Sequence, residues 1–108
     1  MALELRKMCQ YDAMCMVAER EKAAAFLGEI AAHEPAMAEA LEATVDCYER
    51  EMACLGKMHD ATDGYIRTDE QLRKLGEPEA REQIAELILE ARDLDGEAAA
   101  HIERALSM

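Results

Sequence analysis

The chain has 108 residues, the size of one domain, and its 24 acidic and 12 basic residues give a formal net charge of -12. Nucleic acids and anionic membrane surfaces are bound by clustered lysines and arginines, so we expect neither of them as a partner. The apolar residues include 21 alanines but only one Phe, three Tyr and no Trp. Alanine buries little area, and the composition therefore predicts a thin core that a homodimer would complete.

A first long helix is predicted over residues 2–32, where proline is absent and apolar residues recur with a helical period. Its predicted apolar stripe consists of Leu5, Cys9, Met16, Ala23, Phe26 and Ile30. Pro35 ends this helix, because the residue before a proline is disfavoured in the helical region. Proline also suits the first turn of a helix, so a second helix is predicted over residues 36–60 with almost no loop between the two.

The second helix is expected to end between Asp60 and Gly64, where Asp and Gly supply turn chemistry. Its predicted apolar stripe consists of Met37, Leu41, Val45, Tyr48, Met52 and Leu55. Ala40, Cys47 and Cys54 follow one another at intervals of seven and form a seam of small residues. Such a seam lets two helix backbones approach closely.

Two further helices follow. A capping box at residues 68–71 starts a short helix over 68–75 that Gly76 stops, and Pro78 opens the last helix, over 78–106. The apolar stripe of the last helix consists of Ala80, Ile84, Leu87, Ala91, Leu94, Ala98, Ile102 and Ala105. The prediction is an all-α chain in which residues 1–108 form one domain, an antiparallel up-down-up three-helix bundle with a short connecting helix.

The cysteines at 9, 15, 47 and 54 lack the paired spacing of zinc ribbons and fall within helical patterns. No apolar run is long enough to span a membrane, and Glu4, Arg6 and Lys7 interrupt the N-terminus, so no secretory signal is expected. We therefore expect a cytoplasmic protein with free thiols.

Sulfur is predicted to gather at one end of the first hairpin. If the chain turns near Glu34, Cys9 lies near His59 and Cys15 near Cys54, with several methionines around them. Thiolate, thioether and imidazole are the ligands that Cu(I) prefers, and without the methionines the set suits zinc. The alternative is that Cys and Met simply fill the core. We favour core packing and keep Cys9, Cys15, Cys54 and His59 as candidate metal ligands.

Acidic residues interrupt the stripe of the first helix. Asp12 and Glu19 fall on that stripe, and Glu19 would face Glu49 across the hairpin. These carboxylates could form an acid of raised pKa, a cation site or a contact for an arginine. The favoured alternative is that both side chains point into solvent, because charged side chains are rarely buried without partners.

Catalytic signatures are absent from the sequence. It contains no Gly-rich phosphate loop and no nucleophile elbow, and the ExxH spacing of di-iron bundles does not occur. We therefore name no catalytic residue and no cofactor-binding residue, and an enzyme is not the expected class.

Several segments together resemble the C-terminal helical region of bacterial proteins related to the butirosin biosynthesis protein H N-terminal family, whose N-terminal part is papain-like or C39-like. They are EPAMAE at 34–39, CYERE at 47–51, EPEAREQI at 77–84, ILEARD at 88–93 and HIERAL at 101–106. The resemblance implies an accessory helical domain. The catalytic domain itself does not lie in these residues, so no catalytic residue carries over. The stretch 52–59, MACLGKMH, departs from the aromatic residues and histidine of those relatives.

The sequence thus predicts a non-catalytic helical accessory or protein-interaction module that self-associates as a homodimer and binds a protein partner. Two alternatives stay open: a small Cu(I), zinc or thiol-redox bundle, and a helical domain with a methionine-lined ligand pocket.

Overall fold

The chain is all-helical in the described residues, as the sequence predicts. The computed structural model describes the backbone of residues 2–64 and 66–107, and the side chains of 14–64 and 66–107. It contains four helices in this part of the chain: α1 (Ala2–His33), α2 (Ala38–Asp60), α3 (Asp69–Leu75) and α4 (Pro78–Leu106). None of the described helices is long and apolar enough to cross a membrane.

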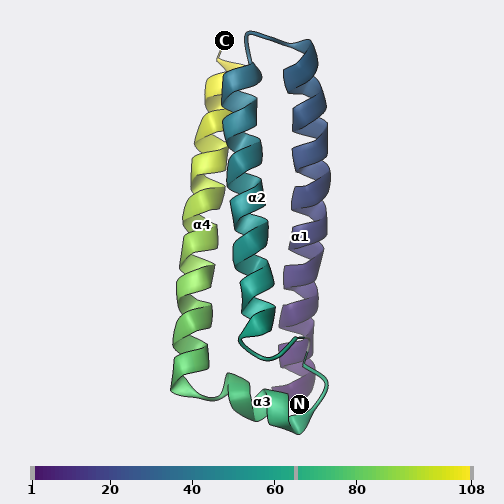
Figure 1. Cartoon of the computed structure of the whole chain (residues 1–108), viewed down its shortest axis with the longest axis vertical. Helices are drawn as coiled ribbons and strands as arrows, with labels where there is room; N and C mark the ends of the chain where they lie inside the picture. Colours follow the sequence, from purple (N-terminus) through teal and green to yellow (C-terminus); the bar gives the residue numbers. More distant parts are fainter. Residues whose placement is uncertain (1, 65, 108) are drawn as a thin grey trace.

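The helix α2 lies between α1 and α4 and packs along both of them (Figure 1). Both flanking helices run antiparallel to α2, and α3 crosses the end of the molecule opposite the α1–α2 turn (Figure 1). The backbones of α1 and α4 hardly approach each other. The molecule measures 52 × 21 × 19 Å, with a radius of gyration of 16.5 Å. A compact chain of this length has a radius of gyration of about 13 Å, so the molecule is elongated.

Most of the described core belongs to α2 and α4. Cys54 of α2 packs with Leu87, Ala91 and Leu94 of α4, and the half-buried Met58 joins them. A second cluster, near the α1–α2 turn, joins all three long helices through Ala31, Ala40, Leu41 and Ala105. Seven of the fourteen buried apolar side chains in the described part are alanines. The core is as thin as the composition predicts.

The packing of α1 differs from its prediction. Among its described side chains only Ala31 is buried, and the expected stripe residues Met16 and Phe26 are 39% and 61% exposed. Ala23 and Ile30 are half-buried. The stripe is therefore only partly covered by α2, because α4 does not close over it.

Turn chemistry sets most helix ends as predicted, with one correction. The Thr68 side chain accepts a hydrogen bond from the Gln71 backbone in a complete capping box, and Pro78 stands in the first turn of α4. Asp63 and Gly64 have positive φ angles in the turn after α2. The expectation that Pro35 opens α2 is wrong, because residues 35–37 form a separate turn and α2 begins at Ala38.

Candidate functional site

A cluster of three charged side chains joins the three long helices near their middle. Arg20 of α1 places Nε 3.4 Å from Oε1 of Glu51 on α2, and its Nη2 donates a hydrogen bond to Oδ1 of Asp95 on α4 at 3.0 Å. The Glu51 side chain is 1% exposed, that of Arg20 23%, and that of Asp95 48%. One arginine thus connects α1 to both other long helices.

The Glu51 carboxyl is incompletely satisfied in its ionised form. Its Oε2 is buried and has no hydrogen-bond partner, and neither has Nε of Arg20. Burial raises the pKa of Glu51 to about 7, the negative charge of Asp95 adds to this, and the positive charge of Arg20 opposes it. A protonated Glu51 can also donate a hydrogen bond to Asp95. The cluster therefore holds an exchangeable proton near neutral pH.

The guanidinium of Arg20 is held from a third direction by an aromatic ring. It lies over the Tyr48 ring at 5.3 Å from the ring centroid, a cation-π distance. Burial alone would lower the pKa of Arg20, but the charges of Glu51 and Asp95 outweigh it and raise the pKa above its usual value. Arg20 therefore stays charged while Glu51 titrates.

Glu51 is buried because it lies on the side of α2 that packs against the neighbouring helices. Ala40, Thr44, Cys47, Glu51 and Cys54 are all buried and recur every three or four residues, which places them on one side of the helix. Thr44 satisfies its own hydroxyl by donating to the Ala40 carbonyl at 2.9 Å. Glu51 alone carries a charge on this side, and Arg20 is its counter-ion.

The acids that the sequence singled out are not the ones that cluster. Glu19 and Glu49 are both exposed, while Asp12 lies outside the residues whose side chains are described. Neither Glu51 nor Arg20 was predicted as a site residue from the sequence. Glu51 lies seven residues after Thr44, the same interval that separates Ala40, Cys47 and Cys54. This spacing places Glu51 beside the seam of small residues and could have identified it.

The candidate metal ligands do not form a described site. Cys54 is buried against α4, whereas Cys15 on α1 and His59 near the end of α2 are half-buried. Cys9 lies outside the residues whose side chains are described. No group of three or more His, Cys, Asp or Glu side chains in the described part is placed to hold a metal ion. A site that includes Cys9 stays a prediction.

The buried thiols favour their protonated form. Burial, followed by the charges of Glu97 and Asp46, raises the pKa of Cys47, and its thiol lies 3.8 Å from Oε2 of Glu97. Burial, followed by the charge of Glu90, raises the pKa of Cys54. Thiolates are the nucleophiles and metal ligands, so both side chains suit core packing better than reactivity.

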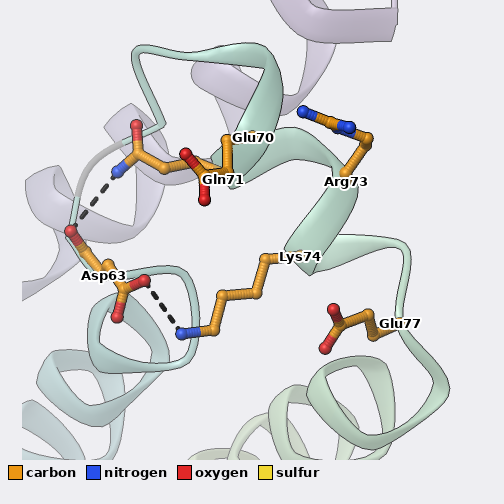
Figure 2. Close-up of a pocket in the computed structure, with 6 residues that line it drawn as sticks. All are labelled: Asp63, Glu70, Gln71, Arg73, Lys74 and Glu77. Atoms are coloured by element: carbon orange, nitrogen blue, oxygen red, sulfur yellow. Dashed lines mark hydrogen bonds and ion pairs between the residues drawn. The ribbon is translucent and has the colours of Figure 1, made fainter.

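A polar hollow of about 540 Å³ lies at the junction of the α2–α3 turn, α3 and the start of α4 (Figure 2). It is lined by Asp63, Glu70, Gln71, Arg73, Lys74 and Glu77. Figure 2 shows Lys74 reaching Asp63, at 2.9 Å, while Gln71 donates to the Asp63 carbonyl at 3.3 Å. These contacts hold α3 against the turn after α2, so Asp63, Gln71 and Lys74 have a structural role there.

Comparisons with known proteins identify no relative of this chain. No family model matches it, no curated protein matches, and no solved structure matches. The resemblance to the helical region of the butirosin-related proteins therefore stays a prediction.

Proposed function

We propose that this chain is a non-catalytic helical interaction module that self-associates as a homodimer and presents its acidic outer surface to a further protein partner. In this proposal a closed helical bundle forms only when two copies of the chain associate. The Arg20 cluster serves, in this proposal, as an internal tie between the three long helices, because its central carboxyl is 1% exposed.

The observation that carries the proposal is the amount of surface left uncovered. The chain exposes 7178 Å², whereas a compact monomer of 12.0 kDa exposes about 6,000 Å². The excess of about 1,200 Å² exceeds the roughly 800 Å² that each partner buries in a stable interface of standard size. The uncovered surface is therefore large enough to be that of one dimer partner.

The composition of the core supports the same conclusion. Half of the described buried apolar side chains are alanines, which contribute little burial energy, while large apolar side chains remain exposed on both α1 and α4. Free thiols at Cys15, Cys47 and Cys54 accord with the cytoplasmic location that we also propose.

Native mass spectrometry of protein purified without added metal tests this proposal. We expect an assembly of twice the 12.0 kDa chain mass that carries no additional mass. A monomer at all concentrations up to the millimolar range would contradict self-association. Additional mass equal to copper or zinc would favour the metal-binding alternative and direct attention to Cys9, Cys15, Cys54 and His59.

A further inference from the structure

One side of α4 carries large apolar residues on either end of the charged cluster. Ile84, Ile88, Ile102 and Leu106 lie 11, 7, 7 and 11 residues from Asp95, spacings that bring side chains back to the same side of a helix. Because Asp95 binds Arg20, this side of α4 is turned toward α1. Ile88 is nevertheless 49% exposed and Leu106 75% exposed.

The side of α1 that carries Arg20 has the same character. Met16 and Ala23 lie four and three residues from Arg20 and share its side of the helix. Phe26, three residues after Ala23, borders this side and is 61% exposed. We call the two sides together the α1–α4 face, defined by Met16, Arg20, Ala23 and Phe26 on α1 and Ile84, Ile88, Asp95, Ile102 and Leu106 on α4.

The two halves of this face are not packed against each other. The backbones of α1 and α4 hardly approach, and Arg20 crosses between them to reach Asp95. The flanking apolar side chains therefore gain little cover from one another. An exposed apolar side of a helix is a surface against which another helix can pack.

We propose that the α1–α4 face is the docking surface for a second copy of this chain, so that α1 and α4 of two protomers pack into a shared layer of helices. This inference rests on the proposed self-association and assigns its location. In a two-fold dimer each copy presents the same patch to the other, and the excess area of about 1,200 Å² is more than the roughly 800 Å² that each copy must bury.

Charge determines how this dimer responds to salt. Each copy has a formal net charge of -12, so two copies repel each other, and screening by salt weakens this repulsion. Association through an apolar face therefore strengthens as salt is added. An interface built chiefly from ion pairs would weaken instead.

Two neighbouring residues of α4 provide a matched test. Ile88 and Leu89 are both large aliphatic residues, each 49% exposed, and they point about 100° apart around the helix. Ile88 belongs to the α1–α4 face, and Leu89 does not. Ile88→Gln and Leu89→Gln remove equal apolar exposure, add no charge and use a good helix former, and circular dichroism checks that both variants keep the helical fold.

Sedimentation equilibrium measures the dimer dissociation constant of each protein, first in low salt and then with added sodium chloride. We expect Ile88→Gln to weaken the dimer about tenfold or more, since a two-fold interface loses the side chain twice. Leu89→Gln should leave the dissociation constant within about twofold of the wild type. Added salt should tighten the wild-type dimer.

The possible failures are distinguishable. A monomeric wild type would overturn the proposed self-association and this inference with it. A wild-type dimer that tolerates Ile88→Gln, or that Leu89→Gln weakens equally, would leave the self-association standing and overturn the assignment of the α1–α4 face. A dimer that weakens as salt is added would overturn the apolar character of the interface.

Discussion

The helices α1 and α4 pack on the same central helix with different chemistry. Six residues of α4 are buried, among them Leu87 and Leu94, whereas Ala31 is the one buried residue among the described side chains of α1. The middle of α1 is held instead by the ion pairs and cation-π contact of Arg20. The comparison indicates that α4 is held on α2 by a buried apolar core, whereas α1 is held more weakly and part of its apolar surface stays exposed.

The largest expected effect is a difference between core substitutions on the two helices. Leu94→Ala removes a side chain that is 3% exposed between α2 and α4, and should lower the free energy of unfolding by about 3 kcal/mol. Leu27→Ala removes a half-buried side chain of α1 and should cost about 1 kcal/mol. Urea unfolding followed by circular dichroism measures both, and equal losses would contradict the comparison.

The second effect concerns the ion pairs that hold α1. Arg20→Met leaves the buried Glu51 without its counter-ion, so we expect a loss of about 2 kcal/mol at pH 8. The loss should shrink at pH 5, where Glu51 can be protonated. Arg50→Met serves as a control, because Arg50 is 57% exposed and its contact with Asp46 spans 3.8 Å. The control should change stability by less than about 0.5 kcal/mol.

A smaller effect follows from the proton on Glu51. The folded chain retains that proton up to about pH 7, compared with a pKa of 4.5 for an unperturbed Glu. The folded state therefore binds more protons than the unfolded state between pH 4.5 and 7, and the free energy of unfolding falls as the pH rises through this range. Glu51→Gln should flatten the fall and gain about 1 kcal/mol at pH 8.

Urea midpoints of the wild type and Glu51→Gln across this pH range check the prediction. Glu49→Gln is the matched control, because Glu49 is an exposed carboxylate two residues away on the same helix. A variant profile that stays parallel to that of the wild type would show that Glu51 does not titrate in this range.

The smallest effect is on thiol reactivity and leaves stability unchanged. In a Cys9→Ser background, the half-buried Cys15 of α1 should react with a thiol reagent about tenfold faster than Cys47 and Cys54, which are buried and have raised pKa values. Mass spectrometry of the labelled chain locates the modified residue. Equal labelling of all three thiols would mean that α2 and α4 open as readily as α1.

Local chemistry explains why much of the helix plan could be predicted. The capping box at Thr68 and the proline at Pro78 determine helix starts through contacts within a few residues. Most of the apolar stripe of α4 was found because one partner helix, α2, covers it, while Ile84 and Ile102 are only half-buried. Pro35 was misassigned because proline also suits a turn, and sequence alone did not distinguish the two.

The candidate site depends on contacts that local patterns do not contain. Intervals of 31 and 44 residues separate Arg20, Glu51 and Asp95 along the chain. In the sequence, each of them looks like an ordinary charged residue on the surface. Because two helices cover α2 from different directions, its buried side is wider than the stripe of Leu41, Val45 and Met52 suggested, and it takes in Glu51. The thin core was predictable, since it follows from composition alone.

Hydrogen exchange of the backbone amides at several protein concentrations tests whether α1 is the weakly held helix and whether a second copy covers it. In dilute protein the amides of residues 14–33 should exchange faster than those of α4, and their protection should rise with protein concentration. Residues of the α2–α4 pair should change much less. Protection of α1 equal to that of α4 at every concentration would contradict the account.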